Sequence, residues 1–327
     1  MRCLYEDTGK GIRLLRCFSP DSTAELPEKI DGEAVTELAP YFFSDHFEAE
    51  KGKGVQWKLW NMQTGECGKA DGEELRARDN ALCGERLKEA ILPKSLVKIG
   101  RYAFYNCSGL EELSFGEALK DIGAGAFTGC HHVKRLSVTT GSTGISCLRE
   151  ILAELPEKIR VEYRKNEEMG VFWFPEYFEE GVENTPARIL ENHVHGSGMR
   201  YRNCFQNKAL DIREYDSLFE SAKAWEDAET VTDLALGRML HPLGLTEAAQ
   251  ARYLAFLQQT LDEACRYLIK KKDGGSLAFV LKQTECTAEM LDGWLDLAAK
   301  LEYTEGVTRL MEERRLRVRP KKRSFSL

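Results

Sequence analysis

One pattern of residues occurs twice in succession between positions 92 and 138. Eight positions match in one constant register: Ile99, Gly100, Ala103, Phe104, Cys107, Leu110, Leu113 and Phe115 are followed by Ile122, Gly123, Ala126, Phe127, Cys130, Val133, Leu136 and Val138. So many matches at one spacing are very unlikely by chance. Because one copy is too short to bury its own apolar positions, the repeat predicts a stack of coils with a continuous core.

Each copy divides into a strand and a turn. The alternating residues 113–115, and their copy, predict a short strand with one buried face. The pair Ala103-Phe104 predicts a helical or turn-like segment opposite that strand. Gly100 fits the tight backbone path that enters the turn. Cys107 and Cys130 are equivalent positions, and we expect them to stack one above the other inside the coils.

These residues resemble the bacterial BspA-like (type 5) leucine-rich repeat family, whose pattern is Ile-Gly-x-x-Ala-Phe, a Cys, and then Leu-x-x-Leu. The resemblance implies a short right-handed solenoid and usually an interaction role. Degenerate copies extend it over about residues 10–163. Ile12–Phe18 is strand-like, 35–43 repeats the turn, Cys83 resumes the pattern after an interruption, and 155–163 is typical of a closing strand.

The chain is therefore predicted to be an α/β solenoid, a short leucine-rich repeat stack of about four partly degenerate repeats, followed by all-α helical hairpins. The expected repeat domain is 1–165 with an insertion at 44–82. An aromatic and arginine-rich connector and cap follows at 166–210, then a helical-hairpin domain at 211–316 and a basic tail at 317–327. A length of 327 residues accommodates two such domains.

The insertion at 44–82 carries five glycines among charged residues, and its alternating residues 55–59 predict a strand or hairpin on a long loop. Trp57 and Trp60 are the candidate contacts with a partner there, because tryptophan is enriched at binding hot spots. The alternative is that one of the two tryptophans pins the loop to the solenoid.

The segment 171–178 has five aromatic residues in eight positions. Because the end of a solenoid exposes apolar core, we expect this segment to cover that end and to hold the second domain. An aromatic ligand pocket is the alternative interpretation.

The connector at 183–204 is rich in Arg, His, Gly and Tyr. A ligand or anion site there would use His193, His195, Arg200, Tyr201 and Arg202. The two histidines with Cys204 could also supply metal ligands, but their gap is irregular and no fourth ligand is evident. Domain docking is the preferred role, with His195-Gly-Ser-Gly198 as a flexible link, and we expect neither metal nor cofactor.

Two apolar stripes at helical spacing mark the C-terminal part of the chain. The first is Leu254, Leu257, Leu261, Ala264, Cys265, Leu268 and Ile269, and the second is Met290, Leu291, Trp294, Leu295, Ala298 and Leu301. Segments 216–224 and 227–240 are also predicted to be helical, the second ending at Pro242 and Gly244. Thr287 is the expected N-cap of the last stripe.

The motif Leu-Asp-x-Ala occurs twice in this part, ending first at Ala264 and again at Ala298. With Glu-x-Val-x-x-Leu after residue 303, it makes residues 246–316 similar to ankyrin repeats, although the Thr-Pro-Leu-His turn of that family is absent. The resemblance implies a second stacked, interaction-type module.

Charge separates the end of the chain from the rest. Residues 314–327 carry seven basic and no acidic residues, so a net charge of −7 for the whole chain leaves −14 for the remainder. Nucleic acid or an anionic membrane surface is therefore a conceivable partner only through this tail. The other interpretation is a solvated end that pairs with the acidic body.

The predicted function is a non-catalytic, intracellular protein-protein interaction scaffold. Its partner would be recognised by residues that point outward from the repeat strands: Glu112, Ser114, Arg135 and Ser137, with the insertion tryptophans as a hydrophobic anchor. The alternatives are an enzyme or ligand-binding protein with its site at 183–204, and nucleic-acid binding through the tail. Ten cysteines without a Cys-x-x-Cys pair, and no secretory signal or membrane span, predict a cytoplasmic location.

Overall fold

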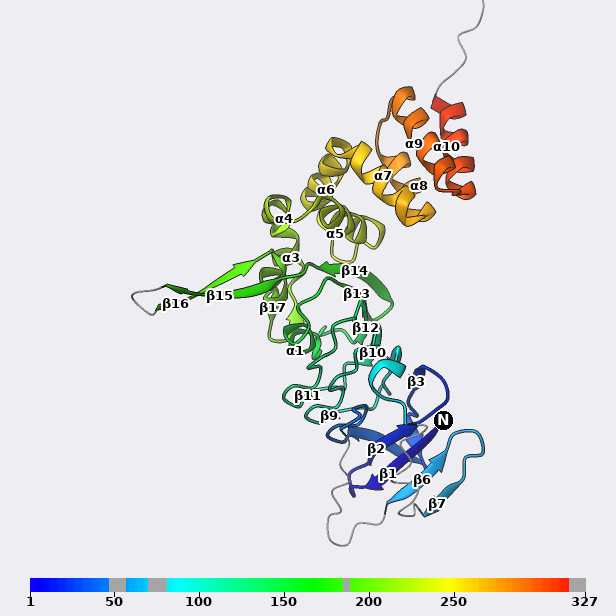
Figure 1. The fold of residues 1–327 in the computed structure, drawn as a ribbon, viewed down its shortest axis with the longest axis vertical. Helices are drawn as coiled ribbons and strands as arrows, with labels where there is room; N and C mark the ends of the chain where they lie inside the picture. The colour runs from blue at the N-terminus through cyan, green and yellow to red at the C-terminus, as the bar shows by residue number, and fades with distance from the viewer. Residues whose placement is uncertain (47–56, 70–80, 185–188, 318–327) are drawn as a thin grey trace, which may run out of the picture. The chain divides into compact units, whose positions relative to one another are not determined.

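The computed structural model describes residues 1–46, 57–69, 81–184 and 189–317 (Figure 1). It divides into two compact units, Met1–Tyr215 and Asp216–Leu327. Residues 166–210, the expected connector and cap, fall within the first unit in this division. The basic segment 318–327, like most of the insertion, lies outside the described residues.

Two sheets run along the first unit. The first, called the recognition sheet below, has the order β14-β13-β12-β10-β8-β3. Its strands are β3 (Thr23–Glu25), β8 (Glu89–Ile91), β10 (Glu112–Gly116), β12 (Arg135–Thr140), β13 (Ile159–Lys165) and β14 (Glu168–Phe174). Neighbouring strands are parallel except for β13 and β14, which are antiparallel. Leu113 pairs with Leu136 and Phe115 with Val138. Residues that are one repeat apart in the sequence are therefore direct neighbours on adjacent strands.

The second sheet joins parallel strands on another side of the same coils. It contains β2 (Ile12–Phe18), β5 (Glu33–Leu38), β9 (Lys98–Ile99) and β11 (Asp121–Ile122), each parallel to its neighbour. Antiparallel strands β1 (Arg2–Asp7), β6 (Lys58–Asn61) and β7 (Cys67–Lys69) extend it beyond β2, and β4 (Lys29–Ile30) pairs with β5. The strand expected over residues 12–18 is present, but it lies in this sheet, and β3 is the strand aligned with the repeat strands.

Aromatic rings and thiols stack in the turns between the sheets. The ring centroids of Phe43 and Phe104 are 5.0 Å apart, and those of Phe104 and Phe127 are 4.9 Å apart. The Cys107 thiol donates to the Phe43 carbonyl at 3.3 Å, and the Cys130 thiol donates to the Phe104 carbonyl at 3.0 Å. The predicted stacking of the two cysteines is thus confirmed. Burial raises the pKa of Cys107 well above its usual value, so this thiol serves packing.

Gly100 and Gly123 are required by the closeness of the coils. Neither has a positive φ. A Cβ at Gly100 would lie 2.5 Å from the Pro40 nitrogen, and one at Gly123 would lie 2.2 Å from the Arg101 nitrogen. The turns approach each other because they exchange hydrogen bonds, such as the Phe104 N–H to the Ala126 carbonyl at 2.8 Å. The expectation of glycine there is confirmed, although the cause is the neighbouring coil and not a special backbone angle.

The stack is closed by helix α1 (Leu148–Ala153) and strand β14. Where a further coil would accept the Phe127 N–H, the carboxylate of Glu154 accepts it at 2.8 Å. Phe172 and Phe174 of β14 are fully buried. The Tyr215 hydroxyl accepts from the Trp173 N–H at 2.9 Å and donates to the Trp173 carbonyl at 2.6 Å, which covers the outer edge of β14. The aromatic segment therefore caps the solenoid, as the sequence predicts.

The rest of the first unit comprises short elements. The hairpin of β15 (Phe178–Asn184) and β16 (Ile189–His195) forms its own two-stranded sheet and extends as an arm (Figure 1). Helix α2 (Gly198–Arg202) and the pair β17 (Phe205–Gln206) and β18 (Ala209–Leu210) follow. A 3-10 turn, η1 (Gly84–Arg86), precedes β8.

Helices make up the second unit: α4 (Phe219–Trp225), α5 (Ala228–Leu240), α6 (Glu247–Gln259), α7 (Leu261–Lys271), α8 (Gly274–Gln283), α9 (Ala288–Lys300) and α10 (Thr304–Arg317). Helix α3 (Ile212–Ser217) crosses the boundary between the units. Side chains of Asp227, Thr246, Asp273 and Thr287 cap α5, α6, α8 and α9, so the predicted cap at Thr287 is confirmed.

The expected stripe at 254–269 is divided between α6 and α7, which are separated by Thr260. Contacts of α5 with α7, α7 with α9, and α8 with α10 make the helices stacked hairpins, as predicted. A short link joins α8 to α9, and no strand occurs in the described part of this unit, residues 216–317. Ankyrin geometry stays a prediction.

A buried ion pair joins the first helices of the second unit. The Arg238 guanidinium, with no exposed surface, donates to both carboxylate oxygens of Asp216, at 2.8 and 3.1 Å. Arg238 also donates to the Leu243 carbonyl at 3.0 Å, and the Tyr253 hydroxyl donates to Asp216 at 2.7 Å. These bonds join α3, α5 and α6 around one buried charge pair.

Candidate protein-interaction surface

Parallel register arranges the outward side chains of the recognition sheet in rows. One row runs Thr23, Glu89, Glu112, Arg135 and Arg160 across five strands, and the next runs Glu25, Ile91, Ser114, Ser137 and Glu162. Their neighbours along each strand, such as Leu113 and Leu136, are buried. The four repeat-strand residues expected to face outward do so, and they lie in two adjacent rows.

Charge is divided along the first row. Glu89 and Glu112 are neighbours at one end, and Arg135 and Arg160 are neighbours at the other. Like charges directly opposite each other destabilise a sheet. Glu112 forms an ion pair with Arg135 across the division, but its side chain stays 35% exposed and that of Arg135 stays 52% exposed. Arg160 likewise forms an ion pair with Glu162 of its own strand, and the two side chains stay 26% and 37% exposed. The row therefore has an acidic and a basic end, and both of its arginines are paired yet partly accessible.

A second line of charges precedes the strands. Lys134 pairs with Glu111 of the preceding coil at 3.0 Å, and this hydrogen bond lowers the pKa of the Glu111 carboxyl. At the end of the sheet, the Lys158 ammonium lies 5.1 Å from the centre of the Trp173 ring. The sequence-based prediction does not name Arg160 and Glu162, although they alternate with buried residues along the expected closing strand. Their place in the two rows follows from the register of β13 with β12.

The two insertion tryptophans have different environments. Trp57 is only 9% exposed and packs among Leu4, Leu15 and Phe18. Its burial favours the pinning role over contact with a partner. Trp60 pairs with Cys3 in the register of β6 and β1 and is half-buried. The predicted hairpin is present as β6 and β7.

The connector residues are not brought together. Tyr201 is 1% exposed and packs edge-on against Tyr215, with ring centroids 4.8 Å apart. Arg202 is 4% exposed and donates to the carbonyl groups of Leu155 and Glu157, both at 2.7 Å, among others. Desolvation lowers the pKa of Arg202 to about 10. Arg202 therefore holds the main chain at the closed end of the solenoid, a role that the sequence does not reveal.

The histidines lie on the arm instead. His193 is exposed, and His195 stacks on Phe178 with ring centroids 4.5 Å apart and contacts Glu180 at 3.2 Å. Arg200 is exposed on α2. The residues of the expected link, 195–198, join the end of β16 to the start of α2. Within the described ranges, no group of three metal-ligating side chains occurs.

Part of the basic tail belongs to α10. Arg314 pairs with Asp292 of α9 at 2.9 Å, and Arg317 pairs with Glu313 at 2.9 Å and donates to the Thr284 carbonyl at 2.9 Å. Two of the seven predicted tail cations are thus engaged in packing helices, and residues 318–327 lie outside the described part. Among the helices that are described, none has the length and apolar character of a membrane span.

Comparison with known families agrees with the geometry of the coils. Residues 77–148 match the family described as BspA type Leucine rich repeat region (6 copies). No curated protein and no solved structure was found to be similar. The matched range includes β8, β10 and β12, three of the five strands that carry the two rows of outward residues. Residues 77–148 of this chain are a BspA-type leucine-rich repeat region.

Proposed function

We propose that this protein is a scaffold that binds a partner protein on the outward face of the recognition sheet. The observation that carries the proposal is the register of β10, β12 and β13, which aligns Glu112, Arg135 and Arg160 in one row and Ser114 and Ser137 in the next. Repeat folds use such extended surfaces for recognition. Leucine-rich repeats generally mediate protein interactions, which supports the same role at the level of the family.

Charge on this face indicates what the partner presents. An acidic half at Glu89 and Glu112 suits basic side chains, and a basic half at Arg135 and Arg160 suits carboxylates. A partner with both charges in the opposite order would relieve the repulsion between the like-charged neighbours. The hydroxyls of Ser114 and Ser137 supply hydrogen bonds between the charged groups. The partner is therefore proposed to be a mixed-charge surface and not a uniformly charged polymer.

A cytoplasmic location and the lack of catalysis are parts of the same proposal. All ten cysteines are free thiols, and most are buried. Such a set of thiols suits a reducing compartment. Recognition through a flat array of side chains requires no pocket and no cofactor, so binding alone accounts for the site.

The experiment is quantitative affinity purification from the native host with charge-reversed variants. Arg135→Glu with Arg160→Glu is expected to reduce recovery of the specific partner at least about tenfold, since turning two attractive contacts into repulsive ones is expected to cost at least about 1.4 kcal/mol of binding free energy in total. Lys98→Glu is the matched control. Lys98 forms the same kind of exposed inter-coil pair, with Asp121 at 3.0 Å, but in the other sheet.

Both variants must keep the wild-type melting temperature within about 2 °C, a shift that corresponds to at most about 1 kcal/mol of stability for a unit of this size. Loss of the same partner from Lys98→Glu, or full retention by the double variant, would remove the recognition sheet as the binding surface.

A further inference from the structure

Among the described strands, β3 pairs only with β8 and therefore lies at an edge of the recognition sheet. The Ser22 carbonyl accepts from the Lys88 N–H at 2.8 Å, and the Leu26 N–H donates to the Ile91 carbonyl at 3.0 Å. Because residues of a parallel strand alternate in the direction of their backbone groups, Thr23 and Glu25 present their N–H and C=O groups away from β8. Among the described residues, no backbone hydrogen bond joins these outward groups to another segment.

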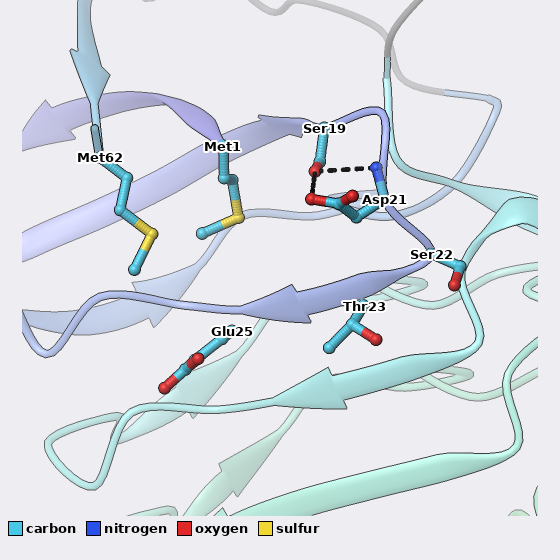
Figure 2. A pocket seen from close by; sticks show the side chains of 7 residues that line it. All are labelled: Met1, Ser19, Asp21, Ser22, Thr23, Glu25 and Met62. Carbon is cyan, nitrogen blue, oxygen red and sulfur yellow. Dashed lines mark hydrogen bonds between the residues drawn. The ribbon is translucent and has the colours of Figure 1, made fainter. Parts of the chain in front are cut away.

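A groove lies along this free edge. It has a volume of about 620 Å³ and is lined by Met1, Ser19, Asp21, Ser22, Thr23, Glu25 and Met62. Figure 2 shows Thr23 and Glu25 on β3, with Met1 and Met62 on the other side of the groove. The Met62 N–H donates to the Met1 carbonyl at 3.0 Å, so the two methionines form one wall, and Met62 is 43% exposed. Methionine side chains adapt to varied apolar groups.

The charged side chains that line the groove, Asp21 and Glu25, are both acidic. Asp21 and Glu25 are exposed, and in the described part of the chain neither makes an ion pair. Asp21 accepts from the Ser19 hydroxyl at 3.3 Å, an uncharged partner. Glu89 of the next strand accepts only a hydroxyl, that of Thr23 at 3.3 Å. The edge thus combines unsatisfied backbone groups with carboxylates that no described cation neutralises.

We propose that the free edge of β3 binds an extended segment of a partner protein that carries lysine or arginine. The segment adds to the sheet as a further strand and bonds the backbone groups of Thr23 and Glu25. Its basic side chains reach Asp21 and Glu25, and an apolar side chain between them contacts Met1 and Met62. Strand addition of this kind takes affinity from main-chain hydrogen bonds and specificity from side-chain pockets.

This edge site adjoins the proposed recognition surface, because Thr23 and Glu25 stand at the ends of its two rows, but it uses the outward backbone groups of β3 and not the side chains of Glu112, Arg135 and Arg160. Its variants are therefore chosen on β3 alone. Failure of either proposal leaves the other intact, since partner recovery with Arg135→Glu and peptide binding with the β3 variants are measured independently.

The test uses a fluorescent synthetic peptide, Thr-Lys-Val-Lys-Val-Lys-Val-Lys-Thr, and its counterpart with Glu in place of Lys. Fluorescence anisotropy at physiological salt is expected to show binding of the lysine peptide to the full chain with a Kd below about 1 mM, and at least about tenfold weaker binding of the glutamate peptide. Glu25→Lys is expected to weaken the lysine peptide at least about tenfold. Glu167→Lys, at an exposed turn elsewhere in the first unit, is the matched control and should leave the Kd unchanged.

Thr23→Pro separates strand addition from simple charge attraction. Proline removes the outward N–H of Thr23 and leaves the hydrogen bonds to β8, because proline is tolerated where the N–H of an edge strand faces solvent. Binding is expected to fall at least about tenfold while the melting temperature is kept.

Equal affinity of wild type, Glu25→Lys and Thr23→Pro for the lysine peptide would overturn the proposal, as would a lack of binding at about 1 mM protein. Self-association of the wild-type chain that Thr23→Pro abolishes would also overturn it, because the occupant would then be a second copy.

Discussion

The contacts that stabilise the first unit internally differ from those that stabilise the second. In the first, each coil bonds mainly to its neighbours, through stacked rings, thiol-to-carbonyl hydrogen bonds and turns that accept backbone N–H groups. In the second, one buried pair, Arg238 and Asp216, joins three helices. Contacts between neighbours distribute stability along a stack, whereas a buried pair concentrates it at one point.

This difference has a consequence for recognition. A stack whose coils share one register produces straight rows of outward side chains, as at Glu112 and Arg135. The described part of the helical unit, residues 216–317, contains no strands, so it has no inter-strand register that would align side chains in such rows. The recognition surface is therefore expected on the first unit.

The largest effect is expected from Arg238→Ala. Removal of the guanidinium leaves the buried carboxylate of Asp216 without its charge partner, which costs roughly 3–5 kcal/mol of unfolding free energy. Hydrogen exchange should lose protection across 216–317 but not across β8 to β12. Arg309→Ala is the control, because Arg309 pairs with Glu305 on the surface of α10, and it should change stability by less than about 0.5 kcal/mol. If Arg238→Ala lowered the free energy of unfolding as little as the control does, the Arg238–Asp216 pair would not be a main source of stability in the second unit.

Gly123→Ala should cause the next largest loss of unfolding free energy, and this residue lies in the first unit. Its new Cβ would lie 2.2 Å from the backbone nitrogen of Arg101, which cannot rotate away, so the coils must separate at a cost of about 3 kcal/mol. Gly116→Ala is the matched control, since the nearest atom to its Cβ is 3.5 Å away. Chemical denaturation of both variants measures the difference. If Gly123→Ala were as stable as Gly116→Ala, close stacking of the turns would not be what holds the coils of the first unit together.

Glu154→Ala is expected to be milder. It leaves the Phe127 N–H without its acceptor at the closed end of the stack, which costs about 1–2 kcal/mol. Glu154→Gln keeps an acceptor oxygen and should recover most of the loss in thermal unfolding. If Gln were as damaging as Ala, the hydrogen bond would not be the reason for glutamate at this position.

The smallest effect concerns the exposed pair of Lys134 and Glu111. Lys134 lowers the pKa of the Glu111 carboxyl, so the pair contributes to stability at neutral pH. That contribution is lost as the pH falls through the lowered folded-state pKa, below the usual value of about 4.3. NMR titration of Lys134→Ala should return the pKa of Glu111 toward its usual value. An unchanged pKa in the variant would exclude Lys134 as the cause.

The repeat strands could be predicted from the sequence because equivalent side chains recur at one constant spacing, which determines both the period and the face. Thr23–Glu25 carries no such recurrence, and the more apolar Ile12–Phe18 fits the composition of a repeat strand better although it lies in the other sheet. The closing aromatic segment was predictable because a solenoid end must be covered.

The candidate site was only partly predictable. The outward direction of Glu112 and Arg135 follows from alternation along the strand, but their charge partners depend on the register between coils. The sequence favours domain docking for the segment around Arg202, with a ligand role as the alternative, but it does not identify the partners of Arg202, because no local pattern shows that carbonyl groups distant in the chain converge on it. The groove beside β3 requires residues 1, 19–25 and 62 to meet, which is a property of the fold alone.

Carboxyl footprinting of the purified complex with the captured partner tests the central claim most directly. A water-soluble carbodiimide labels exposed carboxylates, and mass spectrometry compares free and bound protein. If the recognition sheet binds the partner, labelling of Glu112 and Glu162 should fall several-fold on binding, whereas Asp121 in the other sheet keeps its labelling. Unchanged labelling of Glu112 and Glu162 together with protection of Asp121 would contradict the account.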